Sequence, residues 1–155
     1  MDYFFIFGAK YLYVVIIGIA VIYFFKQPKA TKNKIIILGT VALPVIYVVA
    51  KIVSLLYYDP RPFVEEGFIP IIPHEPDNGF PSDHTLLSAA ISSVLYPFNK
   101  RVGVMTWILA ILVGLSRVYV GVHHYIDVFG SMVISIGVTS LVYIFVKRWK
   151  HYSPD

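Results

Sequence analysis

Two histidines and one aspartate in the second half of the chain have types and spacing suited to nucleophilic catalysis. His123 and Asp127 are four residues apart, so on a helix they share one face. A carboxylate there can hold one imidazole nitrogen as N–H and leave the other nitrogen as a nucleophile. His84, from another part of the chain, could then give a proton to a leaving group.

Two arginines and a serine supply groups that suit a phosphate. The planar fork of Arg61 or Arg117 matches phosphate oxygens, and two arginines facing one cavity would repel each other unless an anion joined them. Ser82 is expected at the N-cap of a helix, where free backbone N–H groups and the helix dipole favour an anion. Together these residues predict a phosphate-binding site.

The elements that carry these residues are strongly apolar. Of the 155 residues, 57% are hydrophobic and 14% are charged, whereas a soluble domain has about 25% charged residues. We therefore expect a single integral-membrane domain over residues 1–155. The chain has no cysteine, which excludes disulfides, thiolate metal sites and cysteine nucleophiles. Residues 1–25 lack a basic first region and a cleavage site, so they are expected to form a retained helix.

Apolar segments predict an all-α membrane protein, a bundle of about five transmembrane helices. A spanning helix needs about 20 apolar residues. The expected spans are 3–25, 35–57, 84–98, 102–119 and 125–146. The third is short, about 22 Å at ~1.5 Å per residue, so its first residues should lie in a recess below the membrane surface. The proline-rich loop 58–83 is too polar to span and has room for short helices.

Basic residues predict the orientation in the cell membrane. Nine of the thirteen lysines and arginines fall in three clusters on one side: Lys26, Lys29, Lys32, Lys34, Lys100, Arg101, Lys147, Arg148 and Lys150. The positive-inside rule makes that side, with the C-terminus, cytoplasmic. The loops 58–83 and 120–124 then meet on the extracytoplasmic side, where the active site is expected.

The candidate residues lie in three motifs with a fixed order and spacing. These are Arg61-Pro62, Pro81-Ser82-Asp83-His84, and Ser116-Arg117 followed by His123 and Asp127. They resemble the three signature motifs of the type-2 phosphatidic acid phosphatase (PAP2) superfamily, over about half of the chain. Within that family, the stretches 58–63 and 72–82 are similar to short bacterial undecaprenyl-diphosphatases.

The resemblance implies a role for each residue. His123 attacks phosphorus and forms a phosphohistidine, Asp127 orients it, and His84 protonates the leaving lipid oxygen and then activates water. The phosphate oxygens are held by Arg61, Arg117 and Ser82. The resemblance implies neither a metal nor another cofactor.

One position departs from the family pattern. The first motif places a lysine seven residues before the arginine, and here that position is Ser54. Lys51 lies one helical turn deeper and is our candidate for the missing phosphate ligand, and Lys10 near the outer end of the first helix is an alternative. Either could instead be a lysine that snorkels to the membrane surface.

Other polar residues are expected to have simpler roles. His124 is expected to be a helix-end neighbour, because the spacing from Arg117 selects His123. His74 is expected to be a loop residue, and Asp83 a carboxylate that favours a helix start. A metal site built from the histidines is disfavoured, because the two arginines would oppose a cation.

The favoured function is hydrolysis of undecaprenyl diphosphate to undecaprenyl phosphate by a metal-independent membrane phosphatase. Alternatives are a phosphatidylglycerophosphate or phosphatidic acid phosphatase, an anion transporter, and an inactive lipid-binding protein. The expected partners are a lipid phosphate substrate and membrane lipids, with no nucleic acid. The oligomeric state cannot be inferred from the sequence.

Overall fold

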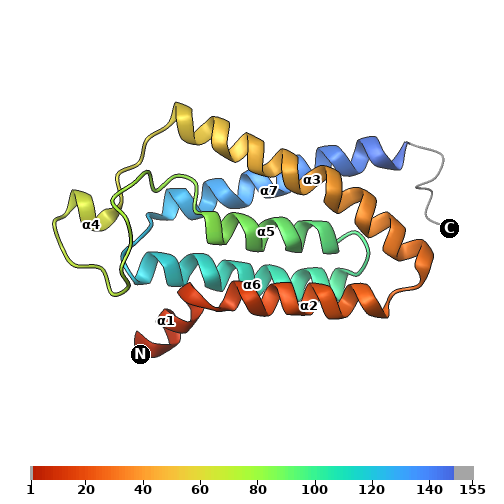
Figure 1. Ribbon diagram of the computed structural model, residues 1–155, viewed down its shortest axis with the longest axis horizontal. Helices are drawn as coiled ribbons and strands as arrows, with labels where there is room; N and C mark the ends of the chain where they lie inside the picture. The colour runs from red at the N-terminus through yellow and green to blue at the C-terminus, as the bar shows by residue number, and fades with distance from the viewer. Residues whose placement is uncertain (1, 149–155) are drawn as a thin grey trace.

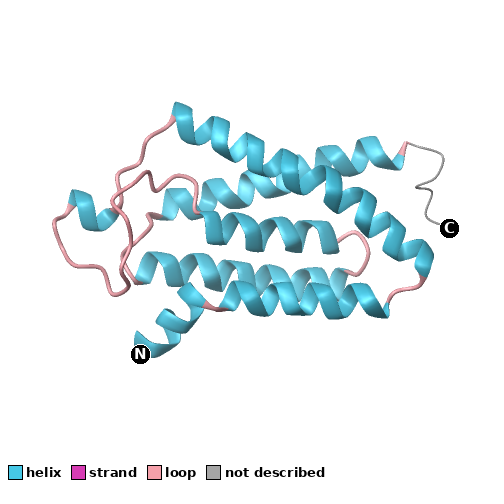
Figure 2. Ribbon diagram, viewed as in Figure 1, coloured by secondary structure: helices cyan, strands magenta, loops and turns pink. Residues whose placement is uncertain are grey.

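The fold is all-helical, as predicted. A computed structural model describes residues 2–148, and within them there are seven helices and no strand (Figure 2). The helices are α1 (Asp2–Lys10), α2 (Leu12–Lys26), α3 (Lys29–Leu56), α4 (Pro62–Glu65), α5 (Asp83–Leu95), α6 (Lys100–Tyr119) and α7 (Tyr125–Lys147). The single-turn helix α4 lies in the predicted long loop.

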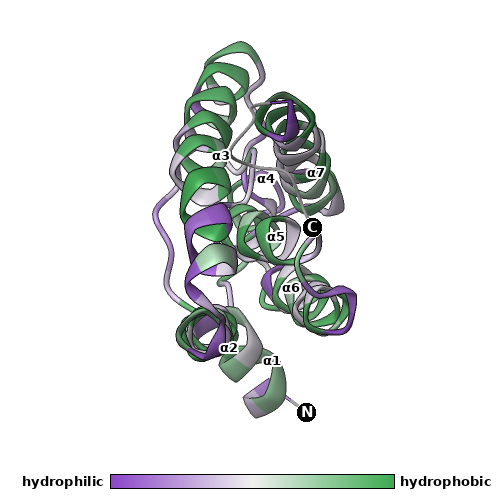
Figure 3. Ribbon diagram, turned by 90° about the vertical axis from the view of Figure 1, so that its right-hand side faces the viewer, coloured by the Kyte–Doolittle hydropathy of each residue, from purple (hydrophilic) through white to green (hydrophobic). Residues whose placement is uncertain are grey.

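The short helix α5 occupies the centre of the bundle. It packs against α2, α3, α6 and α7, and the end-on view shows it between them (Figure 3). Most of its buried positions are small or hydroxylated, and Ser88 and Ser92 donate hydrogen bonds to the carbonyls four residues earlier, at 2.7 and 2.8 Å. Small residues allow close helix packing in an apolar surrounding, and this internal bonding satisfies their hydroxyls.

The remaining long helices have the length and composition of membrane spans. α3, α6 and α7 each qualify alone, and α1 with α2 qualifies as a fourth span that is bent by 51°. Large apolar side chains such as Leu55, Phe129 and Phe145 are exposed on the outside of the bundle, where hydrocarbon replaces water. The protein is therefore an integral membrane protein. With 13 residues, α5 is only about 20 Å long, which agrees with a recessed first turn.

Two helix boundaries differ from those expected from hydropathy. The predicted span 3–25 is interrupted at Tyr11, because α1 turns aside to pack on the end of α6, where Phe5 stacks on Tyr119 at 3.8 Å. α3 begins at Lys29 rather than at residue 35. Pro28 precedes it with φ −64°, a conformation suited to a helix start, and lysine is a good helix former although it is polar.

The two ends of the bundle differ in chemistry. The α2–α3 and α5–α6 turns and the end of α7 lie together at the end that carries the basic residues (Figure 1). The loop with α4 and the α6–α7 connection lie at the opposite end (Figure 1). The fold therefore brings the two loops with the candidate catalytic residues to the same end.

Candidate active site

The candidate site is assembled from three helix ends and one loop. Arg61 is the N-cap of α4, Ser82 is the N-cap of α5, and Arg117 lies in the last turn of α6. His123 lies in the short connection before α7. That connection reverses direction at Gly121, whose φ of +80° favours glycine.

His123 and Asp127 lie in contact, as expected, but His123 precedes α7 instead of sharing a helix face with Asp127. The Nδ1 atom of His123 lies 3.1 Å from Oδ2 of Asp127, and both side chains are almost fully buried. The same Oδ2 accepts the backbone N–H of His124 at 2.9 Å, so the first turn of α7 holds the carboxylate in place. Asp127 can only accept, so the proton of the neutral ring belongs on Nδ1 and the lone pair on Nε2.

The electrostatic surroundings keep His123 neutral. Burial, followed by the charges of Arg117 and Arg61, lowers the pKa of His123 to about 2. The guanidinium of Arg61 lies close to the ring, with Nη1 3.2 Å from Nε2. Nη1 also lies 3.5 Å from Nδ1, so the cation is beside the ring as a whole, and a neutral imidazole next to such a donor is arranged to meet an anionic substrate.

Arg61 is clamped by the surrounding loops. Its Nε donates to Oδ1 of Asp77 at 2.7 Å, and its Nη1 donates to the carbonyl of Val122 at 2.7 Å. Burial opposes ionisation of Asp77, but the hydrogen bond and charge of Arg61 outweigh it and lower the pKa of Asp77. The guanidinium therefore has one fixed orientation beside His123.

Arg117 lacks partners for two of its donor atoms. The side chain is 3% exposed, and Nη1 donates to the carbonyl of Ala9 at 3.5 Å. Its Nε and Nη2 atoms are buried without a hydrogen-bond partner among residues 2–148. An unsatisfied buried donor costs about 1–3 kcal/mol, and more when it is charged, so such a group is retained where an anion completes it.

Ser82 ties the start of α5 to the start of α7. Its hydroxyl accepts a hydrogen bond from Thr85 at 3.0 Å, and its backbone N–H donates to the carbonyl of Asp127 at 3.4 Å. The Ser82 side chain makes no capping bond, so it does not occupy the N–H groups of the first turn. Those groups and the helix dipole suit a phosphate oxygen.

His84 lies in the first turn of α5, beside α2. The ring of Tyr13 meets it edge-on, with 5.0 Å between the ring centroids. The charges of Arg117, Asp83, His74 and Arg61 all act on it. His84 is thus within the electrostatic reach of the same two arginines as His123.

The two candidates for the missing motif lysine, Lys51 and Lys10, both lie near the residues of the site. Lys51 Nζ lies 5.4 Å above the ring of Tyr47, in a cavity of about 180 Å³ that Asp77 and Asp83 also line. Asp77 is the ion-pair partner of Arg61, so Lys51 borders the site through that carboxylate. The alternative, Lys10, ends α1 and is exposed, next to the Ala9 carbonyl that holds Arg117.

Sequence reasoning missed the residue that positions the outer loop. The amide of Asn78 donates to the carbonyl and hydroxyl of Ser54 and to the carbonyl of Tyr57, at 2.9 to 3.1 Å. Its oxygen accepts the backbone N–H groups of Asp59 and Phe80 at 3.0 Å. Ser54, where the family pattern has lysine, thus anchors this loop to α3. A partly buried asparagine with several hydrogen bonds carries no signal in a single sequence.

Two other histidines, His124 and His74, also lie near the candidate nucleophile. The Nδ1 atom of His124 lies 2.9 Å from Oδ2 of Asp59, and its Nε2 lies 3.6 Å from Oε2 of Glu65. His74 is a loop residue, as expected, but its ring lies 6.1 Å from that of His123. Burial and the charge of Arg61 lower the pKa of His74. Both histidines therefore belong to the surroundings of the candidate nucleophile.

One group of side chains could geometrically hold a cation. Among residues 2–148, ligand atoms of Asp59, His124 and Asp127 lie within 4.8 Å of one another. The charge of Arg61 acts on the same Asp127 carboxylate and opposes a cation there. The arrangement is better described as a hydrogen-bonded support for Asp127 than as a metal centre.

Comparison with known proteins finds relatives of this chain. The chain is 40% identical over 98 residues to "Undecaprenyl-diphosphatase BcrC" of Bacillus subtilis (strain 168), covering 63% of this chain and 51% of that protein. It is 33% identical over 142 residues to "Bacitracin transport permease protein BcrC" of Bacillus licheniformis, covering 90% and 68%. The chain thus spans about half the length of the first of these relatives.

A solved structure shares the fold. The crystal structure of a transmembrane PAP2 type phosphatidylglycerolphosphate phosphatase from Bacillus subtilis superimposes with a TM-score of 0.58 at 25% identity. The match covers 96% of this chain and 85% of that one. The family model described as "PAP2 superfamily" matches residues 33–151, a range that includes Arg61, Ser82, Arg117 and the His123–Asp127 pair. The chain belongs to the PAP2 superfamily.

Proposed function

We propose that the protein is a metal-independent lipid phosphatase that forms a phosphohistidine at His123, with undecaprenyl diphosphate as the favoured substrate. The observation that carries this proposal is the pair of unpartnered donor atoms on buried Arg117, whose charge acts on the neutral, buried His123. A phosphoryl group would satisfy those donors and lie next to the nucleophile.

In the first half of the reaction, Nε2 of His123 attacks phosphorus while the bond from phosphorus to the leaving oxygen breaks. Asp127 keeps Nδ1–H in place and stabilises the positive charge that develops on the ring. His84 gives its proton to the leaving oxygen. Arg61 Nη1, now 3.2 Å from Nε2, can transfer its hydrogen bond to a phosphate oxygen as the P–N bond forms.

In the second half, water releases the phosphate. His84, now deprotonated, takes a proton from water, and the hydroxide oxygen attacks phosphorus as the P–N bond breaks. The products are inorganic phosphate and neutral His123. Arg61, Arg117 and the first turn of α5 hold the phosphate oxygens throughout, so no metal ion is required for charge neutralisation.

The substrate assignment rests on the relatives. The first relative is named as an undecaprenyl-diphosphatase, at 40% identity. The solved structure is a phosphatidylglycerolphosphate phosphatase, at 25% identity, which keeps that lipid as the second candidate. A panel of both lipids and phosphatidic acid, compared by kcat/KM with a chelator present, decides between them. A higher kcat/KM for either monophosphate would contradict our assignment.

We further propose that the site faces the extracytoplasmic side, with the C-terminus in the cytoplasm. The support is the basic end of the bundle, opposite the site (Figure 1). Because the chain has no cysteine, single cysteines report sidedness cleanly. In intact cells, a membrane-impermeant maleimide should label Ile69→Cys in the site loop and should not label Gln27→Cys in the α2–α3 turn. The reverse pattern would contradict the orientation.

A further inference from the structure

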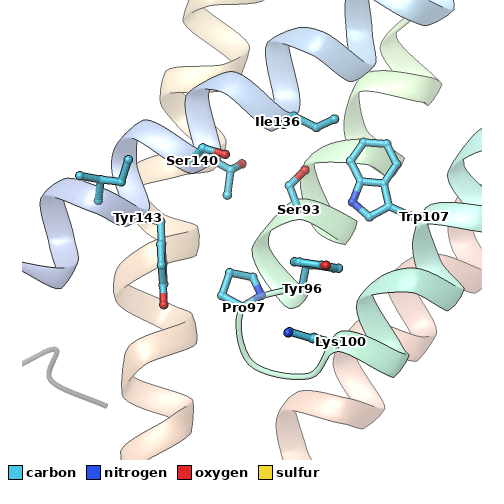
Figure 4. A pocket seen from close by; sticks show the side chains of 10 residues that line it. Ser93, Tyr96, Pro97, Lys100, Trp107, Ile136, Ser140 and Tyr143 are labelled. Atoms are coloured by element: carbon cyan, nitrogen blue, oxygen red, sulfur yellow. The ribbon is translucent and has the colours of Figure 1, made fainter.

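A second cavity lies at the basic end of the bundle, remote from His123. It has a volume of about 560 Å³, within the range of about 300–1,000 Å³ typical of small-molecule sites. It opens between α5, α6 and α7, beside the α5–α6 turn (Figure 4). Ile136 and Tyr143 in its wall lie roughly 17 and 27 Å along α7 from the start of that helix, so the cavity is separate from the catalytic site.

Two hydroxyl groups in the wall of the cavity are unsatisfied. Ser93 on α5 is 8% exposed and Thr139 on α7 is 3% exposed, and both line the cavity. Neither hydroxyl oxygen has a hydrogen-bond partner among residues 2–148. Other hydroxyls in these helices, such as those of Ser92 and Ser135, donate to the carbonyl four residues earlier. The hydroxyl groups of Ser93 and Thr139 therefore lack an acceptor that a ligand in the cavity would supply.

The rest of the cavity wall is apolar on the side that faces lipid and carries a lysine at the α5–α6 turn. Trp107, Ile136 and Ile144 form an apolar side, and Ile136 and Ile144 are each 50% exposed on the lipid-facing surface of α7. Lys100 lies at the turn that closes the cavity (Figure 4). Within residues 2–148 no acidic side chain pairs with Lys100. The cavity thus joins the bilayer-facing surface at its side and a lysine at its end.

We propose that this cavity binds one anionic phospholipid from the leaflet at the basic end of the bundle. An acyl chain packs along Trp107, Ile136 and Ile144, the hydroxyls of Ser93 and Thr139 donate to ester carbonyl oxygens, and Lys100 binds the headgroup phosphate. A lipid fits better than a soluble ligand, because the opening continues into the exposed apolar surface that faces hydrocarbon. The proposal is independent of the catalytic function.

Fluorescence quenching of Trp107 tests the proposal directly. In a Trp149→Phe background Trp107 is the one tryptophan, and the protein is placed in bilayers that contain brominated phosphatidylglycerol or brominated phosphatidylcholine. We expect brominated phosphatidylglycerol to quench Trp107 at a several-fold lower mole fraction.

Matched variants test whether the preference for phosphatidylglycerol over phosphatidylcholine arises in the cavity. Lys100→Gln should reduce the preference about fivefold, whereas Arg101→Gln, its exposed neighbour outside the cavity, should keep it. Thr139→Val keeps the shape of the side chain and should weaken quenching by both lipids. Phosphate release should stay within twofold of the wild-type rate in all three variants, which shows that they are folded.

Three outcomes would overturn the proposal. Equal quenching by the two lipids in the wild type would show non-selective bilayer contact only. An undiminished preference in Lys100→Gln would place the anion elsewhere. Dimerisation that depends on Lys100 and Thr139, without a lipid preference, would assign the cavity to a second copy of the chain.

Discussion

The Nδ1 atom of His123 lies 3.1 Å from the Oδ2 atom of Asp127, inside the protein and four residues apart in the chain. The pair is rigid because Oδ2 also accepts the backbone N–H of His124, at the beginning of α7. A single carboxylate therefore caps the helix and fixes the tautomer of the candidate nucleophile. This double use of Asp127 makes its replacement informative.

Asp127→Asn should lower kcat for phosphate release by about 10²–10⁴-fold, because an amide can stabilise the wrong tautomer of His123. KM should change little, since Asp127 does not contact the phosphate. The measurement is steady-state release of inorganic phosphate, with folding checked by thermal unfolding. A variant with kcat within threefold of the wild type would remove Asp127 from the mechanism.

Arg117→Met should separate stability from activity. The substitution removes a buried cation with two unsatisfied donor atoms, so Tm without phosphate should stay equal or rise, while activity falls at least 100-fold. Inorganic phosphate should raise Tm of the wild type and leave that of Arg117→Met unchanged. Arg148→Met, at the basic end of the bundle, is the control and should match the wild type in both measurements. Lower stability together with retained activity would contradict a phosphate-binding role.

His123 should remain neutral well below the usual histidine pKa. Burial and the charges of Arg117 and Arg61 lower the pKa of His123 to about 2, so its ring should not titrate between pH 7.5 and 5. The NMR signal of ¹⁵N-labelled histidine that disappears in His123→Gln identifies this ring. A midpoint near pH 6.5 for that signal would contradict the buried, neutral nucleophile.

The same shift has a consequence for stability. The unfolded chain binds a proton on His123 below about pH 6.5, whereas the folded protein does not. The free energy of unfolding should therefore decrease as pH falls below about 6.5, and His123→Gln should lose this part of the pH dependence. An identical pH dependence in the two proteins would argue against the shift.

Asp59 should act as a positioning residue through His124. Burial raises the pKa of Asp59, the hydrogen bond to His124 opposes that rise, and Asp127 adds to it, so the three groups are electrostatically linked. Asp59→Ala should lower kcat about 3–30-fold at nearly constant KM, and Asp59→Asn should recover part of the loss because its amide oxygen can still accept from Nδ1–H. Glu65→Gln is the control: its carboxylate is mostly exposed, and we expect less than a twofold effect. Equal effects of Asp59→Ala and Glu65→Gln would refute a specific role for Asp59.

Much of the site could be predicted because it depends on residues that are close in the sequence. His123 and Asp127 do meet, although His123 lies before α7 and the contact forms across the start of that helix rather than along one helix face, and Ser82 precedes a helix as its type suggests. The positions of the basic clusters predicted that the loops 58–83 and 120–124 lie at the same end of the bundle. These features depend on local periodicity and charge, which one sequence displays directly.

The parts that were not predicted depend on tertiary packing. The break at Tyr11 reflects the contact of α1 with the end of α6, and in the sequence a single lysine, Lys10, separates two apolar stretches there. The contacts of Asn78 with Ser54 join residues 24 positions apart, and the Asp59–His124 pair spans 65 positions. No pattern within a single sequence marks such pairs.

Trapping of the covalent intermediate tests whether His123 is the nucleophile. Wild-type protein mixed with lipid substrate that carries ³²P in its terminal phosphate and quenched in alkali should hold acid-labile, alkali-stable label on the peptide that contains His123. His123→Ala should hold no label and should release phosphate at least 10³-fold more slowly. Wild-type-like phosphate release by His123→Ala, or label bound stably to another residue, would contradict the central claim.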